Sequence, residues 1–239
     1  PQKSGYTGVA MFLKSNLSVV MAIYFLNIIS AAALPLIGAV DVSAGGLAAA
    51  AAIFCAMNVL GVTVTFHRGL SHRAFRFRWK WLEYLFSMCG ITACTGSPLG
   101  WVGIHRDHHQ YSDTRMDPHR SAKGFWRLQA IDYNRASPFL AKSEKSEQRS
   151  KWMIRDIVSD GFYRATHEYY FGFVLSYVAI LTLIFGLPGV FYGLIVPSAL
   201  TLFAENLTNW AAHHGFGYYN FITGDSSRNV WWLNFFSFG

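Results

Sequence analysis

Residues 169–204 read YYFGFVLSYVAILTLIFGLPGVFYGLIVPSALTLFA and contain no Asp, Glu, Lys, Arg or His over 36 positions. A helix that spans the hydrocarbon core of a bilayer needs about 20 apolar residues, so this run is too long for one span. Gly186-Leu187-Pro188-Gly189 interrupts its middle, and Gly and Pro punctuate regular elements. The run therefore predicts two spans, at 169–187 and 189–208, joined by a tight turn.

Two more uncharged runs lie nearer the N-terminus, at 15–40 (26 residues) and 42–66 (25 residues). Each is long enough for one span. The sequence thus predicts an all-α integral membrane protein with four transmembrane helices in two hairpins. We expect a single domain over 1–239, with a cytosolic helical cap at 67–168 and a further cytosolic segment at 209–239.

The run from Tyr84 to Ile104 is uncharged over 21 residues but more polar than the others, and it ends in Gly-Ser-Pro-Leu-Gly at 96–100. Its hydroxyl side chains are Ser87, Thr92, Thr95 and Ser97. We expect a re-entrant or interfacial pair of helices here. A full crossing would place the histidines that follow on the wrong side of the membrane from those at 67–72.

The distribution of charge predicts the orientation. Residues 67–164 hold 17 Lys and Arg against 9 Asp and Glu, whereas both predicted hairpin loops lack Lys and Arg. The positive-inside rule places the cap on the cytoplasmic side. The basic charge is then a matter of topology and lipid headgroups, with no indication of nucleic-acid binding, although a docking face around Arg73–Lys80 for an acidic partner could overlap it.

Composition excludes several classes. Only 14% of the residues are charged and 52% are hydrophobic, which excludes a disordered or collagen-like chain. The three cysteines form no Cys-x2-Cys pair, so a thiolate zinc site or redox dithiol is not indicated. We expect Cys55, Cys89 and Cys94 to be buried, small apolar residues.

Seven of the nine histidines fall into three tight groups, each next to an apolar run. The groups are His67 and His72 in HRGLSH, His105, His108 and His109 in HRDHH, and His213 and His214 in NWAAHH. Burying so many imidazoles is costly unless something binds them. A shared metal site would supply that partner, and imidazole alone does not choose between Zn, Cu, Fe and Ni.

Helical spacing brings several of these side chains together. On a helix, His105 lies three and four residues before His108 and His109, so the three share one face. His213 lies four residues after Asn209, and Glu205 is one turn earlier on that face. His67 and His72 are five apart, about 140° on an ideal helix, so they converge only if the helix bends or ends. More than five imidazoles favour two ions over one.

At these residues the chain resembles the membrane fatty acyl desaturases of the stearoyl-CoA and acyl-lipid delta-9 type. The shared motifs are HRGLSHRAF (67–75), GWVGIHRDHHQYSDTRMDPH (100–119), KGFW (123–126) and NWAAHHGFG (209–217). The resemblance implies two irons that activate O2, and an enzyme that inserts a cis double bond, delta-9 in position, into a saturated acyl chain. The iron ligands it implies are His67, His72, His105, His108, His109 and His213.

The resemblance also gives roles to neighbouring residues. Asn209 corresponds to a residue that lies behind the ligands or reaches iron through water. His214, Asp117 and His119 are further candidates, of which His119 is expected to hydrogen-bond with Asp117 within its loop. His167, beside Glu168, is expected to be an interfacial anchor.

The chain departs from the family pattern in two places. It ends at NVWWLNFFSFG, where the family's third His-x2-His-His box should begin, so we expect a truncated chain with an incomplete metal site and absent or impaired activity. The dipeptide Gly103-Ile104 stands where the animal acyl-CoA enzymes have Arg-Asp that helps hold CoA. The acyl chain of the substrate could therefore be carried by a lipid or by acyl-carrier protein as well as by CoA.

The family's reaction removes hydrogens from unactivated methylene groups, which needs a cofactor. No haem, flavin or NAD motif is visible, so electrons would come from a small b-type cytochrome or a ferredoxin. The membrane could be the endoplasmic reticulum, a plastid membrane or a bacterial inner membrane. Three alternatives stay open: a histidine-box hydroxylase or monooxygenase, a metal-ion transporter, for which polar residues within the spans would be expected, and a relative that has lost catalysis.

Overall fold

The computed structural model describes residues 7–130, 140, 144–222 and 224–237. These residues form helices and connecting loops, and the described part contains no β-strand beyond one isolated bridge between Tyr218 and Asn229. The longer helices are α1 (Thr7–Leu36), α2 (Ala44–Cys55), η1 (Ala56–Ser71), α3 (Lys80–Thr92), α4 (Pro98–Tyr111), α6 (Glu144–Met153), α7 (Gly161–Glu168), α8 (Tyr170–Val190) and α9 (Val196–His213). The short ones are η2 (Ser121–Lys123), α5 (Phe125–Gln129), η3 (Phe191–Ile195), η4 (Trp231–Leu233) and α10 (Asn234–Ser237).

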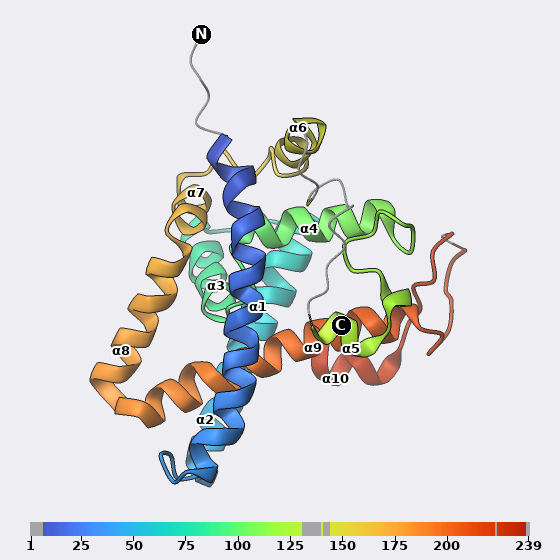
Figure 1. Cartoon of the computed structure of the whole chain (residues 1–239). Coiled ribbons are helices and arrows are strands. Elements are labelled where there is room, and N and C mark those ends of the chain that lie inside the picture. Colours follow the sequence, from blue (N-terminus) through green and yellow to red (C-terminus); the bar gives the residue numbers. More distant parts are fainter. Residues whose placement is uncertain (1–6, 131–139, 141–143, 223, 238–239) are drawn as a thin grey trace.

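Three of the described helices are long and apolar enough to cross a membrane. They run over Val19–Leu36, Ala44–Ser71 and Tyr170–His213. The third continues through the predicted turn, but Gly186 has φ 64° and ψ −155° inside it, a conformation that glycine adopts without steric cost. The chain therefore bends sharply there, so that α8 and α9 run in different directions (Figure 1). Four separate spans in two hairpins remain a prediction.

The run at 84–104 folds as two helices, α3 and α4, and is not among the helices long enough to span. The break falls at 93–97, where Cys94 and Gly96 have positive φ. Ser97 caps α4 by accepting a hydrogen bond from the amide of Gly100 at 3.3 Å, and Pro98 occupies its first turn. The helix pair that the sequence predicts is thus present, with Gly-Ser-Pro supplying the stop and the new start.

The second long helix changes its winding along its length. From Ala56 to Ser71 it is a π-helix, with hydrogen bonds between residues five apart. It packs against α3 so closely that a Cβ atom on Gly61 would lie 2.2 Å from the backbone nitrogen of Gly90. The helix also continues beyond the predicted end at 66, which keeps His67 within it.

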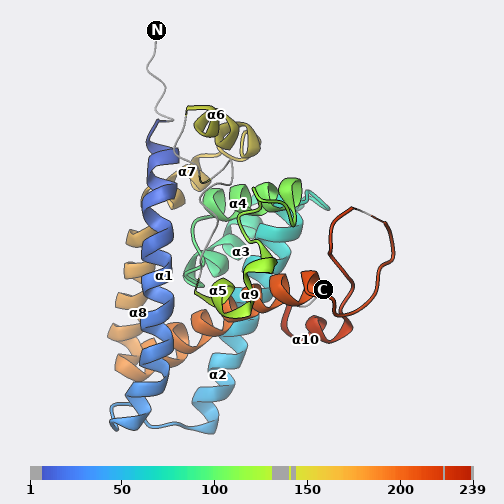
Figure 2. The same cartoon turned by 45° about the vertical axis from the view of Figure 1, so that its right-hand side comes forward.

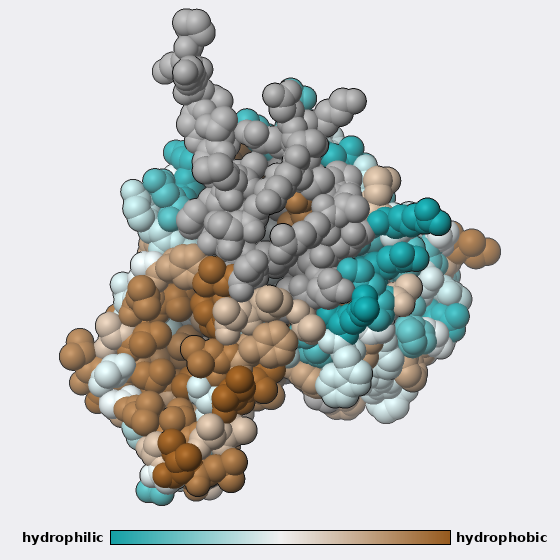
Figure 3. All heavy atoms as spheres, in the orientation of Figure 1, coloured by the Kyte–Doolittle hydropathy of each residue, from teal (hydrophilic) through white to brown (hydrophobic). Residues whose placement is uncertain are grey.

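The main core holds α4 between η1, α7 and the loop after α6. Its fully buried side chains include Phe66, Ile91, Leu99, Val102, Ile154, Tyr163 and Tyr170. Figure 2 shows α4, α6 and α7 gathered at one end of the long helices. Figure 3 shows that hydrophobic residues cover the other end, while hydrophilic residues gather on the flank of the α4 end. This polarity fits a membrane-embedded part with a polar cap.

The cysteine prediction is only partly right. Cys94 is buried, but Cys89 is half-buried and Cys55 is exposed on the apolar helix that crosses the lower part of the molecule. An exposed apolar helix face is suited to lipid, so a residue of small apolar character is acceptable there without being covered by protein.

Candidate metal centre

The π-helix sets the position of the first two histidines. His72 lies just after η1 and donates its backbone amide to the carbonyl of His67 at 2.9 Å. In a π-helix, residues five apart lie on nearly the same face, whereas in an α-helix they would be about 140° apart. The two side chains therefore meet. Their Nε2 atoms lie 3.0 Å apart.

The helix α4 supplies the other half of this group. His72 Nε2 lies 3.2 Å from His105 Nε2, and His105 Nε2 lies 3.0 Å from His109 Nε2. One ligand atom from each of His67, His72, His105 and His109 can be chosen so that all four lie within 4.8 Å of one another. We call these four residues the first histidine group.

The chemistry of this group suits a cation. Burial first, and the neighbouring imidazoles second, hold the pKa of His105 well below its ordinary value, and burial lowers that of His109 to about 4. Imidazoles that stay neutral at pH 7 are the form that ligates metal. Among the described residues, these four ring nitrogens converge without a carboxylate in the group, an arrangement that suits a metal ion bound by imidazoles.

A second histidine group, made of His108, His119 and His213, adjoins the first. The ring of His108 lies 6.3 Å from that of His105, 5.6 Å from that of His119 and 5.2 Å from that of His213. His108 comes from α4, His213 from the end of α9 and His119 from the loop that follows α4. The groups are thus in contact through α4.

Two carboxylates orient the second group. Nδ1 of His108 lies 2.8 Å from Asp117 Oδ1, and Nδ1 of His213 lies 3.0 Å from Asp113 Oδ2. Burial is the largest single effect and by itself raises the pKa of Asp117. The hydrogen bond and electrostatic attraction of His108, together with the hydrogen bonds from the backbone amides of Asp113 and His119, outweigh it, so the net shift of this pKa is downward. With Nδ1 engaged by a carboxylate, Nε2 of each imidazole is left for a metal, as is usual for histidine ligands.

The sequence motifs did not predict that Asp113 orients His213. Asp113 has φ 61° and also accepts a hydrogen bond from the amide of Ser226 at 2.7 Å. Aspartate tolerates this left-handed conformation better than most residues. The only sequence signal is its place in YSDTRMDPH, and nothing in that pattern shows that it reaches α9.

The remaining predicted residues differ in their placement. Asn209 donates from Nδ2 to the carbonyl of His119 at 3.1 Å and lines the cavity described below. The backbone amide of His119 donates to Asp117 at 2.8 Å, while its ring sits beside His108. His214 stacks on Trp210, with ring centres 4.9 Å apart, on an exposed part of the surface.

His167 is not the interfacial anchor that the sequence suggested. It is buried, and its Nδ1 lies 2.5 Å from the hydroxyl of Ser97, the residue that caps α4. The reason is that α7 packs against α4 with its histidine facing inward. His167 therefore helps to fix the helix that carries three of the site histidines.

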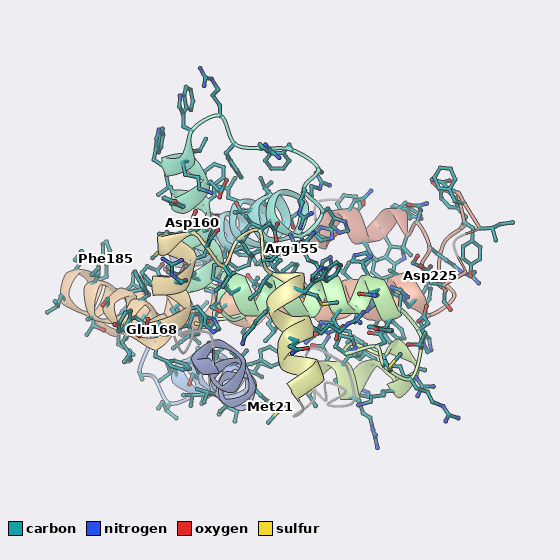
Figure 4. All side chains as sticks on the ribbon, turned by 90° about the horizontal axis from the view of Figure 1, so that it is seen from above. Met21, Arg155, Asp160, Glu168, Phe185 and Asp225 are labelled. Carbon is teal, nitrogen blue, oxygen red and sulfur yellow. The ribbon has the colours of Figure 1, made fainter. Side chains whose placement is uncertain are left out.

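Histidines of both groups line one cavity of about 330 Å³: His67, His105 and His109 from the first group and all three of the second. Its wall includes Val62, Trp101, Ile104, Ala204 and Glu205, from η1, α4 and α9. Seen from above, the ribbon of α4 runs over that of α9 across the middle of the molecule (Figure 4). A pocket with apolar walls that ends on convergent polar groups is the usual form of a ligand site.

Comparison with known proteins identifies the family. The sequence model described as fatty acid desaturase matches residues 44–239. The chain belongs to the fatty acid desaturase family. It is 35% identical over 187 residues to Delta-9 acyl-lipid desaturase 2 of Arabidopsis thaliana, which is 78% of this chain and 59% of that one.

Other desaturases give a similar picture. The identity is 36% to the sn-1 stearoyl-lipid 9-desaturase of Synechocystis sp., over 75% of this chain and 54% of that one. It is 32% to the Acyl-CoA C20 Delta5-desaturase of Anemone leveillei, over 76% and 56%. The chain thus spans a little over half the length of the curated desaturases it matches. The family is one of enzymes, oxidoreductases that act on fatty acyl chains, as the resemblance of the histidine motifs implied.

Proposed function

We propose that this chain forms the histidine-rich centre of an O2-dependent fatty acyl desaturase that introduces a cis double bond, delta-9 in position, into a saturated chain. The observation that carries the proposal is the meeting of the two histidine groups through His105 and His108, whose ring centres are 6.3 Å apart. The two groups also share a cavity with apolar walls. A site with a single metal ion would not need both histidine groups.

The two groups fit two iron ions. The proposed ligands are His67, His72, His105 and His109 on one side and His108 and His213 on the other, with Asn209 behind them and His119 and Asp117 adjoining. The first group offers four nitrogen donors, and the second offers imidazoles already oriented by Asp113 and Asp117. When bound, the irons supply the oxidation of the C–H bonds by O2, which no side chain can perform.

The protein's own task is to bind and to position. The overall change is –CH2–CH2– + O2 + 2 e⁻ + 2 H⁺ giving –CH=CH– + 2 H2O, so one pair of carbons must be held beside the histidines and water kept away. Trp101, Val62 and Ile104 supply apolar wall on the side of η1 and α4. The indole of Trp101 stacks on His105, with ring centres 4.8 Å apart, so a chain lying against this wall would be next to the centre.

Acyl groups esterified in lipids are the proposed substrates, with acyl-CoA as the alternative carrier. The delta-9 relatives are named as acyl-lipid or stearoyl-lipid enzymes, whereas the Anemone protein is named for acyl-CoA. The dipeptide Gly103-Ile104 offers no charge to CoA. A small electron-transfer protein, a b-type cytochrome or a ferredoxin, would deliver the two electrons.

The proposed site is on the cytoplasmic side of a multi-pass membrane protein. The helix α4, which carries three of the histidines, lies at the end of the long helices opposite the hydrophobic one, in the part of the sequence rich in Arg and Lys. The positive-inside rule assigns this end to the cytoplasm.

The test is expression in a host that has no acyl desaturase, followed by mass spectrometry of the fatty acids and of double-bond adducts. Delta-9 unsaturation that disappears in the His108→Ala variant supports the proposal. Hydroxylated acids instead of alkenes would assign the chain to the hydroxylases. Loosely exchanging metal with no lipid product would favour transport and overturn the proposal.

A further inference from the structure

The segment Arg73–Trp81, which we call the Arg–Trp segment, connects the second long helix to α3. Its sequence, RAFRFRWKW, alternates cations with aromatic rings. It starts two residues after the end of the apolar stretch Ala44–Ser71. Seen from above, the chain leading into α3 projects outward from the rest of the molecule (Figure 4).

One set of its aromatic rings packs back onto the protein. Phe75 and Phe77 lie 5.1 Å apart, and Phe77 contacts Phe86 of α3 at 5.8 Å. A Cβ atom added at Gly69 would lie 3.5 Å from the ring of Phe77 and 3.6 Å from that of Phe75. The segment is therefore held against the end of η1, and its outer side is presented in a fixed position.

The outer rings are two tryptophans. Trp79 is 55% exposed and Trp81 61%, and the two stack with ring centres 6.2 Å apart. Leu85, one turn further along α3, is exposed as well. Tryptophan concentrates at the boundary between hydrocarbon and headgroups, so this face of α3 fits the rim of a bilayer.

The cations at the two ends of the segment are already paired. Arg73 lies 2.9 Å from Asp156, and Lys80 lies 2.5 Å from Glu83 and 3.2 Å from Asp160. Between them, Arg76 and Arg78 are exposed and form no ion pair with any described residue. In the part of the chain that the structure describes, these two guanidinium groups thus have no carboxylate partner, and they are close in sequence to the two indoles.

We propose that the Arg–Trp segment binds the phosphate groups of anionic membrane lipids, with Arg76 and Arg78 on the headgroups and Trp79 and Trp81 in the interface below. Guanidinium groups bind phosphate through paired hydrogen bonds. The same positive charge could also attract an acidic redox protein. The two indoles, close to the end of a membrane-spanning stretch, favour a lipid as the binding partner instead. The inference depends on membrane insertion and is independent of the chemistry at the histidines.

The experiment measures the binding of phosphatidylglycerol to the protein in mixed phosphatidylcholine micelles, by native mass spectrometry and by tryptophan emission. Each basic residue near an anionic surface contributes about 1 kcal/mol. The double variant Arg76→Gln, Arg78→Gln should therefore bind phosphatidylglycerol roughly 30-fold more weakly, since 1.4 kcal/mol is tenfold. The variant Arg115→Gln, Arg127→Gln loses the same charge elsewhere and should bind as the parent does.

Two further arms keep the proposal falsifiable. In the Trp79→Phe, Trp81→Phe variant the lipid-induced change in emission should disappear. A change that persists would show that these two indoles do not enter the interface and would overturn the proposed role for them. Equal weakening by both arginine pairs would show a general charge effect and overturn the proposal. Unchanged lipid binding in the Arg76, Arg78 variant, with slower reduction by an acidic ferredoxin, would assign the segment to protein docking instead. Displacement of the lipid by inorganic phosphate alone would exclude a role for the membrane.

Discussion

The indole of Trp101 connects Glu205 to His105: its Nε1 donates a hydrogen bond to Glu205 Oε2 at 3.0 Å, and its ring stacks on the imidazole at an interplanar angle of 20°. The same indole touches the edge of His67, with ring centres 6.3 Å apart. The carboxyl group of a residue in α9 thus fixes a ring that lies against imidazoles from both η1 and α4. The first histidine group is held by this contact as well as by its own helices.

This relationship predicts different results for two substitutions of Glu205. Glu205→Leu removes the acceptor and leaves the indole N–H unpaired, at a cost of about 1–3 kcal/mol, so Trp101 should be less well fixed. We expect a lower unfolding temperature and a several-fold loss of bound iron, measured by elemental analysis of the purified protein. Glu205→Gln keeps an acceptor oxygen and should retain most of the iron. Equal iron content in the Leu variant and the parent would refute a positioning role.

The carboxylates behind the second histidine group predict a loss of metal without a loss of fold. In Asp117→Asn and Asp113→Asn the partner of a histidine Nδ1 becomes neutral. Changes to such outer partners typically weaken metal binding 10–100-fold. Competition with a chelator measures the affinity, and Asp41→Asn in the exposed hairpin loop is the matched control. If Asp41→Asn loses as much metal as the other two, the orienting role is wrong.

The lowered histidine pKa values predict acid sensitivity of the metal-free protein. Burial lowers the pKa of His109 to about 4 and that of His119 to about 3, whereas an unfolded chain protonates its histidines near 6.5. As the pH falls below about 6.5, the histidines of the unfolded state bind protons, whereas His109 and His119 in the folded state stay neutral. The free energy of unfolding therefore decreases as the pH falls to about 4. Thermal unfolding between pH 7 and 4 measures this.

The variant His119→Gln supplies the comparison for the pH series. It removes one buried imidazole, so its unfolding temperature should fall less steeply over the same range. Parallel curves for the variant and the parent would show that other groups govern the acid response.

The sequence predicts those parts of the site that depend on neighbouring residues, and not those that depend on contacts between segments distant in sequence. The break between α3 and α4 was visible because Gly96, Ser97 and Pro98 act locally. The sharing of a face by His105 and His109 followed from helical spacing. The convergence of His67 and His72 could only be stated as a condition, because π-winding appears where η1 packs on α3, and that packing joins segments distant in sequence. The contact of Asp113 with α9 was invisible for the same reason.

Close packing of η1 on α3 gives the last prediction. In Gly61→Ala the new Cβ would lie 2.2 Å from the backbone nitrogen of Gly90 and 2.5 Å from its Cα. Backbone atoms cannot move aside as a flexible side chain would, so the helices must separate, and overpacking of this kind costs about 1–3 kcal/mol or more.

The separation would displace the part of η1 that carries His67, so stability and iron content should fall together. Gly45→Ala in α2 is the control, because nothing lies within 4 Å of its added Cβ. In a helix this change should stabilise the protein by about 0.5–1 kcal/mol. Thermal unfolding and iron content of the two variants would be compared. A Gly61→Ala protein as stable and as iron-rich as the parent would mean that the π-winding does not depend on this contact.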